Sequence, residues 1–523
     1  MQRSLVLWCC VGVVTGCAVD NSESRAVAGR GASGSASVGV GPGGHGVSDG
    51  AGGAGPLGSS DAEAGSEASS GIAGAAGAYD AGDVEAGLPP HGWLPNVRVN
   101  DDTGRAAQVE VSLAAGTAGL ILASWVDSRN GTRCAFSVST DGGTTWGKNI
   151  TVAPTGSGIT GDAVAGIDAS GKLYAVCQDY GVSQILLSTS SDRGSTWSGW
   201  RPIQASPDKP WVAGVRNGTI FLSWLGSPGG FKRSLDGGAT WSAVTSLGTL
   251  SHGTAISPVD DGVVHVPYNQ GAQVRYLRSK DFGATFDPGR NLADMGTACF
   301  GCTPRHHPII GSGVSPNGRV VAITWASTAP GGDGNDDVWV VISQDGGDSW
   351  SKAMRVNDNS TPSRQFQPWT AVDAQGRVHV IWTDFRNGGQ NATYYARAEN
   401  PYTEFSKNIE ITDQRGAPPS FMGDYKGLAI VGNDMFAAWC DSRNGNGDVY
   451  FSRASVDMLI EARTTQPFIA QIAGNHRVMK LPATETSMGP PEGWETPRPP
   501  SRPQHRRRPT PPAPQADRNQ GTK

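Results

Sequence analysis

Short segments in which apolar and polar residues alternate follow one another from residue 91 to residue 463. Alternation with a period of two is typical of β-strands that bury one face. Such segments recur roughly every 10 residues, separated by clusters of Gly, Asp, Asn and Ser, and a longer period of roughly 50 residues groups them in fours. This pattern predicts an all-β protein built from the four-stranded blades of a β-propeller.

One turn motif marks the longer period. Five segments contain Ser, Asp, Gly, then Thr or Ser, and end on Trp or Phe, and their aspartates lie 51, 44, 45 and 64 residues apart. Ser and Asp side chains can hydrogen-bond the amides of their own turn, and Gly readily takes a positive φ. We therefore expect these aspartates to hold hairpins rather than to catalyse: Asp141, Asp192, Asp236, Asp281 and Asp345.

The number of blades follows from the repeat count. Six units run through to Phe405, and the seventh, which follows it, has only three strand-like segments. Near the start of the pattern, Asn96–Asp101 matches the fourth strand of the fifth unit at residues 354–358. We expect this N-terminal strand to complete the last blade, which gives a closed ring of seven blades without a free edge, with six blades as the alternative.

The five turns resemble the Asp-box (BNR) repeat of the sialidase family, and the resemblance covers about 370 residues. It implies a glycoside hydrolase of the exo-α-sialidase type, in which a tyrosine is the nucleophile. On this resemblance the catalytic candidates are Tyr425, Asp424, Asp127 and Arg129. The chain departs from the family because no arginine begins the strand at residues 107–111, and no acid/base aspartate follows Arg129.

A second motif, Trp-x-Asp-x-Arg-Asn-Gly, occurs at residues 125–131, 382–388 and 439–445. Each Asp and Arg could form a local ion pair, or together they could line a polar rim that binds anionic or hydroxyl-rich ligands. Arginine binds carboxylates with two parallel hydrogen bonds, which suits a carboxylated sugar. The candidate ligand-binding residues are Arg305, His306, His307, Arg364, Gln367, Asp384, Arg386, Asp441 and Arg443.

The two ends of the chain differ from the repeat in composition. Residues 1–17 combine a basic start, a short apolar run and Cys17 at the end, which resembles the signal peptide of bacterial lipoproteins with Cys17 lipidated. Residues 18–90 form a Gly/Ala/Ser-rich tether, and residues 21–90 alone hold 19 of the 73 glycines. We expect the tether to be disordered, like the Pro/Arg-rich tail at residues 464–523.

Five cysteines remain outside the signal segment. An exported chain permits disulfides, and Cys299 and Cys302 could form a loop disulfide or, with His306 and His307, a metal site. We expect the disulfide and no metal, because a second pair of ligands is missing. Cys134, Cys177 and Cys440 leave one odd thiol whose partner the sequence does not identify.

The net charge and the motifs limit the classes of function that we expect for the protein. The net charge of −5 provides no basic body for nucleic acid. We expect an exported monomer that acts on or binds glycans. It would be lipid-anchored at the outer membrane or cell surface, or otherwise secreted. We expect no cofactor, and no motif indicates structural calcium. The alternatives are a non-catalytic carbohydrate- or protein-binding propeller with degenerate catalytic residues, and an assembly factor for other envelope proteins.

Overall fold

The computed structural model describes residues 92–458, except 156–157, 206–207, 217, 227, 251–254, 297–303, 305–308, 329–334 and 361. These residues belong to the first of two compact units, Met1–Thr464 and Thr465–Lys523. The expected signal peptide, tether and tail lie outside the described residues. Within the described part of the chain, no helix is long and apolar enough to cross a membrane.

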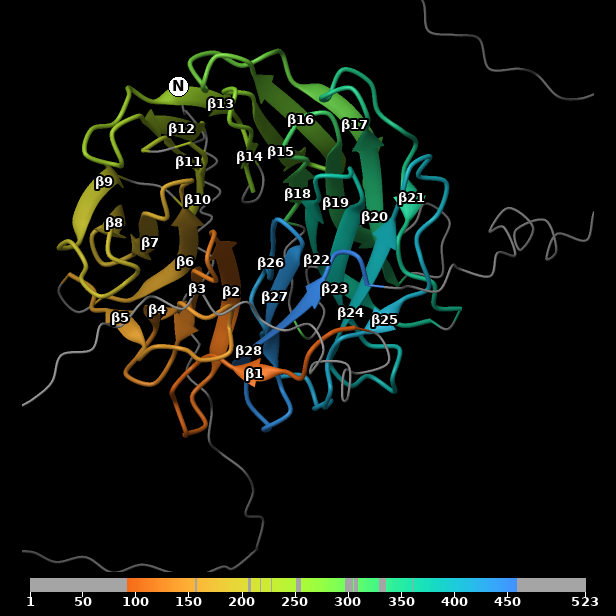
Figure 1. Ribbon diagram of the computed structural model, residues 1–523, viewed down its shortest axis with the longest axis horizontal. Coiled ribbons are helices and arrows are strands. Elements are labelled where there is room, and N and C mark those ends of the chain that lie inside the picture. Colours follow the sequence, from red (N-terminus) through yellow and green to blue (C-terminus); the bar gives the residue numbers. More distant parts are fainter. Residues whose placement is uncertain are drawn as a thin grey trace, which may run out of the picture. The chain divides into compact units, whose positions relative to one another are not determined.

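Seven four-stranded antiparallel sheets are arranged in a ring, as Figure 1 shows. The first three blades take their strands in sequence order, from the axis of the ring outward. Blade 1 contains β2 (Gln108–Ala115), β3 (Ile121–Asp127), β4 (Arg133–Ser139) and β5 (Ile150–Val152). Blade 2 contains β6 (Thr160–Ile167), β7 (Leu173–Asp179), β8 (Gln184–Ser190) and β9 (Arg201–Ala205). Blade 3 contains β10 (Asp208–Gly214), β11 (Ile220–Leu225), β12 (Gly229–Ser234) and β13 (Thr245–Gly248).

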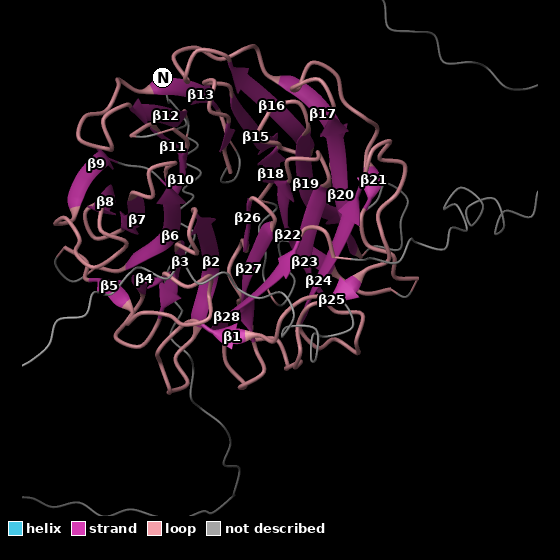
Figure 2. Cartoon of the chain, in the orientation of Figure 1, coloured by secondary structure: helices cyan, strands magenta, loops and turns pink. Residues whose placement is uncertain are grey.

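The next three blades repeat this order. Blade 4 contains β14 (Ser257–Pro258), β15 (Val264–Gln270), β16 (Gln273–Ser279) and β17 (Arg290–Asp294). Blade 5 contains β18 (Gly311–Val314), β19 (Val321–Thr328), β20 (Asp336–Ser343) and β21 (Met354–Arg355). Blade 6 contains β22 (Gln365–Val372), β23 (Val378–Asp384), β24 (Ala392–Ala398) and β25 (Ile409–Glu410). Among the described residues, strands and loops account for the whole fold (Figure 2).

Blade 7 is built from both ends of the repeat. It contains β26 (Gly427–Val431), β27 (Asp434–Asp441) and β28 (Asp448–Ser455), and its outer strand is β1 (Val97–Arg98). Val97 pairs with Phe451 and Arg98 with Tyr450, in antiparallel register. The predicted seven blades and the closure by the N-terminal strand are therefore confirmed, and the six-blade alternative is wrong.

Apolar side chains between neighbouring sheets form the core. The second strands of four blades each carry an almost completely buried tryptophan: Trp125, Trp325, Trp382 and Trp439. One apolar cluster contains both Trp125 of blade 1 and Phe451 of blade 7, so the first and last blades pack against each other where the ring closes. Burial of each large side chain contributes about 1.5–3 kcal/mol, which makes contact between blades the main source of stability.

The Asp-box turns hold their own hairpins by hydrogen bonds. In the first box, the Thr145 amide donates to Asp141 Oδ1 at 3.0 Å and the Thr145 hydroxyl to Asp141 Oδ2 at 2.6 Å. The Gly143 amide donates to Ser139 Oγ at 2.8 Å. The same bonds recur at Asp192, Asp236, Asp281 and Asp345. Saturation of these carboxylates by their own turns matches the structural role expected for them.

Candidate functional site

The Asp-x-Arg loops fasten neighbouring blades together. Arg386 binds Asp384 of its own blade at 2.8 Å and also Asp358 at 2.6 Å, which follows the outer strand of blade 5. The Arg386 guanidinium stacks on Tyr394, with its carbon 4.3 Å from the ring centroid. We call an arginine that binds one aspartate of its own blade and one of the neighbouring blade a clasp. It recurs at Arg129 with Asp127 and Asp101, and at Arg443 with Asp441 and Asp413.

The clasps decide between the two interpretations of this motif. Each arginine lies between two carboxylates that belong to adjacent blades, so its charge is already compensated. The side chains of Arg129, Arg386 and Arg443 extend towards outer strands instead of converging on the axis of the ring. The geometry is that of the local ion pair, extended to a second blade, and it does not assemble a rim of free arginines around the axis.

A different group of residues meets near the axis. Glu110, Asp162, Lys209 and Gln367 have φ values of 58°, 48°, 43° and 53°, which lie in the left-handed region that non-glycine residues rarely adopt. Each of these residues lies in the first strand of its blade, at a point where the pairing register with the second strand shifts; the blades are 1, 2, 3 and 6. A bulge turns a side chain out of the regular alternation, and strained residues of this kind gather at functional sites.

Lys209 is the centre of this group. Its Nζ lies 2.9 Å from Asp424 Oδ2, 3.2 Å from Asp162 Oδ1 and 3.7 Å from Glu110 Oε1. We call Glu110, Asp162, Lys209 and Asp424 the axial cluster. Its members come from blade 1, blade 2, blade 3 and the segment that leads into blade 7, so only the closed ring brings them together.

Burial and charge shift the pKa values in the axial cluster. Burial raises the pKa of Glu110 well above its usual value, and although Lys209 opposes this, the charges of Asp162 and Asp424 add to it. Burial alone would lower the pKa of Lys209, but Asp162, Asp424 and Glu110 raise it well above its usual value. Glu110 therefore keeps its proton to a higher pH than an exposed glutamate does, and Lys209 keeps its ammonium form to a higher pH than an exposed lysine does.

Hydrogen bonds and aromatic rings enclose the axial cluster. The Tyr180 hydroxyl donates a short hydrogen bond to Asp162 Oδ2. Trp211, Trp369 and Tyr425 pack together, with the Trp211 centroid 4.9 Å from that of Trp369 and 5.5 Å from that of Tyr425. Trp211 is only half-buried.

The axial cluster opens on the face that carries the Asp-x-Arg loops. Asp208, at the start of β10, pairs with Leu225 at the end of β11, and Gln108 pairs in the same way with Asp127. The Lys209 amide donates to Asp208 Oδ1 at 3.0 Å, and Asp208 itself is exposed. The site thus consists of the exposed carboxylate of Asp208 at the surface and the axial cluster beneath it.

The catalytic candidates lie in two places. Asp424 belongs to the axial cluster, whereas Asp127 and Arg129 form part of a clasp. Tyr425 lies beside the cluster and is 3% exposed, and its hydroxyl donates to the Ala163 carbonyl at 3.4 Å. Burial, followed by the charges of Glu110 and Asp162, raises the pKa of Tyr425 well above its usual value. The phenol is therefore held in its neutral form.

The ligand-binding candidates are also divided. The Gln367 side chain donates to the Gly423 carbonyl and accepts from the Thr383 hydroxyl at 2.9 Å, which ties blade 6 to the segment before blade 7. Arg364 lies 3.4 Å from Asp336 Oδ2 and over the ring of Phe366. Arg305, His306 and His307 lie outside the described residues, as do Cys299 and Cys302.

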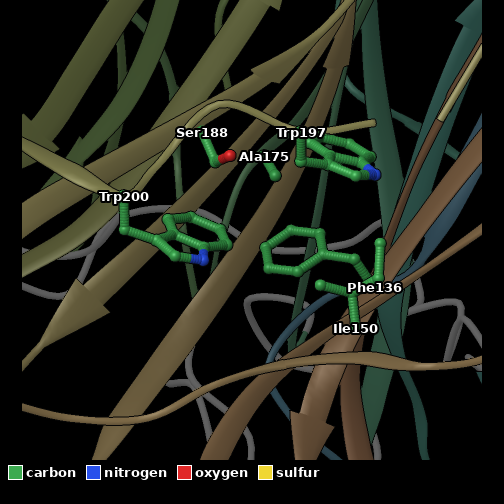
Figure 3. A pocket seen from close by; sticks show the side chains of 6 residues that line it. All are labelled: Phe136, Ile150, Ala175, Ser188, Trp197 and Trp200. Carbon is green, nitrogen blue, oxygen red and sulfur yellow. The ribbon is translucent and has the colours of Figure 1, made fainter. Parts of the chain in front are cut away.

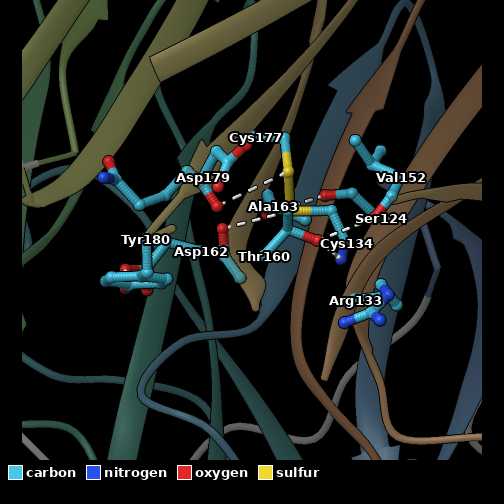
Figure 4. Close-up of a disulfide and its surroundings, with 12 residues drawn as sticks. Ser124, Arg133, Cys134, Val152, Thr160, Asp162, Ala163, Cys177, Asp179 and Tyr180 are labelled. Carbon is cyan, nitrogen blue, oxygen red and sulfur yellow. Dashed lines mark hydrogen bonds between the residues drawn. A yellow bond between two sulfur atoms is a disulfide. The ribbon is translucent and has the colours of Figure 1, made fainter. Parts of the chain in front are cut away.

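The described cysteines form one disulfide, between Cys134 on β4 and Cys177 on β7 (Figure 4). It joins blade 1 to blade 2, a pairing that the sequence left open. Cys440 is a buried free thiol. Within the described ranges, no group of three or more His, Cys, Asp and Glu residues has the arrangement of a metal site.

Two cavities lie away from the axial cluster. An apolar notch between blades 1 and 2 is lined by Phe136, Ile150, Ala175, Ser188, Trp197 and Trp200, as Figure 3 shows. A polar recess at the outer edge of blade 6 is lined by Gln390, Glu410, Thr412, Asp413 and Arg415. Arg415 is paired with Glu410 and Asp413 with Arg443, so these charged groups of the recess already have partners.

Sequence reasoning missed Glu110 and Asp162 as site residues. A signal was present, because Lys209-Pro210-Trp211 and Gln367-Pro368-Trp369 share a spacing at the start of two blades. Alignment of the other blades on this position would have placed Glu110 and Asp162 beside Lys209. The bulge itself, which turns these side chains towards the axis, leaves no mark of its own in the sequence.

Comparison with known proteins shows a shared fold. No protein-family profile and no curated protein matches the sequence. Among solved structures, "YCF48 bound to D1 peptide" is similar to 72% of this chain and 97% of its own, at 14% identity and a TM-score of 0.42. The Penicillium chrysogenum α-L-arabinanase complexed with arabinobiose is similar over 70% of this chain and 99% of its own, at 13% identity and a TM-score of 0.40.

A sialidase is similar to a comparable extent. The NanB sialidase from Streptococcus pneumoniae covers 70% of this chain and 71% of its own, at 14% identity and a TM-score of 0.39. The chain is a seven-bladed β-propeller with Asp-box turns. At these identities the likeness concerns the fold alone, and the function has to be argued from the site.

Proposed function

We propose that the protein is a glycan-binding propeller whose site is the axial cluster together with the half-buried Trp211, which packs against Tyr425. The observation that carries the proposal is the convergence of Glu110, Asp162 and Lys209 from three blades, each on strained backbone. Strain of about 1–3 kcal/mol per residue persists only where the surrounding structure enforces it. Carboxylates that accept hydrogen bonds from hydroxyl groups, beside an aromatic face, suit a sugar ring.

The charges of the site favour neutral or amine-bearing sugars over carboxylated ones. Lys209 is already compensated by Asp162 and Asp424, and the three clasp arginines are compensated by their own aspartates. A ligand carboxylate placed near the axial cluster would face like charges. This proposal replaces the carboxylated sugar expected from the arginine-rich motifs.

Hydrolysis of the glycan is a second candidate, favoured by one observation. The pKa of Glu110 is raised next to Asp162 and Asp424, and glycosidases use a carboxyl group of raised pKa together with a carboxylate. Glu110 would donate a proton to the leaving oxygen. This candidate predicts that Glu110→Gln removes turnover of aryl glycosides but leaves glycan binding within about threefold, a modest change in binding free energy.

Binding can be tested with the full mature chain and an array of neutral, amine-bearing and carboxylated oligosaccharides, followed by calorimetry on the strongest ligand. We expect Asp424→Asn to weaken binding tenfold or more, because one lost charge-assisted hydrogen bond costs about 1.5–3 kcal/mol. Arg193→Gln, on the Asp-box face, is the matched control and should bind normally. Equal affinity of wild type and Asp424→Asn would reject the axial cluster as the site.

Export with a lipid anchor on Cys17 completes the proposal. The Cys134–Cys177 disulfide supports it, because disulfides persist mainly in oxidising compartments. We predict that Cys17→Ser abolishes incorporation of a labelled fatty acid and moves the protein from the membrane fraction to the soluble fraction. Unchanged fractionation with membranes would show that Cys17 is not the anchor.

A further inference from the structure

The disulfide between blades 1 and 2 lies directly behind the strand that carries Asp162. Cys134 Sγ lies 3.1 Å from the Gly161 carbonyl oxygen. The Cys134 amide donates to Thr160 Oγ1 at 2.9 Å, and the Thr160 hydroxyl donates to the Val152 carbonyl at 2.8 Å. Cys134 therefore contacts both residues that precede Asp162.

The second half-cystine is close to the other support of Asp162. Cys177 lies three residues before Tyr180, whose hydroxyl donates to Asp162 Oδ2. Figure 4 shows the disulfide, Thr160, Asp162 and Tyr180 side by side. The Tyr180 amide also donates to the Ile159 carbonyl at 3.0 Å, which ties the turn after β7 to the start of β6.

Asp162 needs such support because its backbone is strained. Its φ of 48° costs free energy that neighbouring contacts must offset. Tyr180 and Lys209 contact the Asp162 side chain, and the disulfide contacts the carbonyl of the preceding residue, Gly161. Without the covalent link, the segment at residues 160–163 would keep only non-covalent bonds to blade 1 and could relax to ordinary strand geometry, which would turn Asp162 away from Lys209.

We propose that the Cys134–Cys177 disulfide positions Asp162, so that the axial cluster is completed only when the chain is oxidised. The inference rests on the proposed function of that cluster and adds its regulation. Oxidation proceeds by thiol–disulfide exchange: the two cysteine thiols lose two protons and two electrons to an oxidised dithiol partner, which leaves as a dithiol. The site would thus be incomplete in a reducing compartment and assemble after export.

Hydrogen exchange tests the positioning role without any ligand. We expect Cys134→Ala/Cys177→Ala to speed amide exchange at least tenfold in Thr160–Ile167, while Gln365–Val372 of blade 6 stays at the wild-type rate. Cys440→Ser, which removes the buried free thiol, is the control and should leave both segments unchanged. Equal exchange of Thr160–Ile167 in the wild type and the double variant would overturn the inference, even if the melting temperature fell.

Thr160→Val supplies a second route that keeps the disulfide. It removes the acceptor for the Cys134 amide, and we expect the same local acceleration, so the inference remains testable if the double cysteine variant does not fold. Unchanged exchange in Thr160→Val together with a misfolded cysteine variant would assign the disulfide to stability alone and overturn the inference.

A binding measurement then separates this inference from the proposed function. With the strongest array ligand, Asp162→Asn should weaken binding when the disulfide is present. It should cause little further loss of affinity in the variant without the disulfide, because both changes remove the same contact of Asp162 with the ligand. Additive losses would overturn the inference and leave the function intact. If no glycan binds any form, the proposed function fails while the exchange result still decides the role of the disulfide.

Discussion

At the scale of single residues, buried polar side chains carry the chemistry of this protein. The pKa of Lys209 is raised because three acidic side chains outweigh the effect of burial, whereas burial and neighbouring charge raise the pKa of Glu110. The two histidines buried in the blades differ in their partners, because His379 lies 3.1 Å from Asp373 Oδ2 whereas the charge of Arg278 adds to the effect of burial at His265. His265 and His379 are completely buried and lie 2.7 Å and 2.9 Å from tyrosine hydroxyls.

His265 predicts how stability depends on pH. Burial, followed by the charge of Arg278, lowers its pKa from 6.5 to about 3. Between pH 6.5 and about pH 3, His265 is therefore protonated in the unfolded chain but neutral in the folded chain. The free energy of unfolding consequently decreases as the pH is lowered through this range. We expect His265→Asn to reduce the loss of unfolding free energy between pH 7 and pH 5 by about 2 kcal/mol, measured by urea denaturation.

Tyr276→Phe is the matched control for this prediction. It removes the hydrogen bond to His265 but leaves the imidazole buried. It should lower stability by about 1 kcal/mol at both pH values and leave the pH dependence as in the wild type. A wild-type pH dependence in His265→Asn would mean that His265 does not titrate on unfolding.

At the scale of elements, each Asp-box turn attaches its blade to the preceding one as well as closing its own hairpin. A Cβ at Gly143 would lie 2.1 Å from an atom of the Phe451 ring in blade 7, and the φ of Gly143 is +85°. Gly283 approaches Phe231 and Gly347 approaches Tyr276 in the same way. The glycine of the motif is therefore needed twice, for the turn and for contact between blades.

This double role yields a quantitative prediction. Gly143→Ala should lower the free energy of unfolding by about 3 kcal/mol, from the unfavourable φ and the overlap with Phe451 together. Gly388→Ala is the control, because its φ is +69° and nothing lies within 4 Å of the added carbon. It should lose only about 1 kcal/mol. Equal losses in chemical denaturation would refute the contact between blades.

At the scale of the whole molecule, the ring is closed by a strand that comes from the other end of the repeat. Trp93, just before β1, is completely buried and packs edge-on against Tyr395 at 5.4 Å. The Asn96 amide donates to Asp413, and Arg443 binds both residues. The first ten described residues thus contact blades 6 and 7.

A truncation tests this closure. A chain that begins after Asp102 should lose its cooperative thermal transition or aggregate, because blade 7 loses its outer strand and the Trp93 burial, which alone is worth about 3–5 kcal/mol. A chain that begins at Gly92 keeps β1 and should melt like the full-length protein. An unchanged melting temperature in the shorter chain would show that β1 does not close the ring.

The sequence by itself determined the blade count, the closure and the hairpin turns. These features depend on local chemistry: apolar and polar residues alternate over a few positions, Gly takes a positive φ, and Ser and Asp bind the amides of their own turn. The number of blades follows from the number of repeats. The clasp residues were also recognisable, since Asp384 and Arg386 are two positions apart, although their second partners in the preceding blade were not.

Only the tertiary structure decided the axial cluster and the disulfide. Lys209 and Asp424 are 215 positions apart, and their contact exists because the ring returns blade 7 to blade 1. Glu110 and Asp162 reach Lys209 through bulges that interrupt the alternation of their strands, and Cys134 meets Cys177 through the packing of two sheets. Contacts of this kind depend on the position of whole sheets, which no short stretch of sequence specifies.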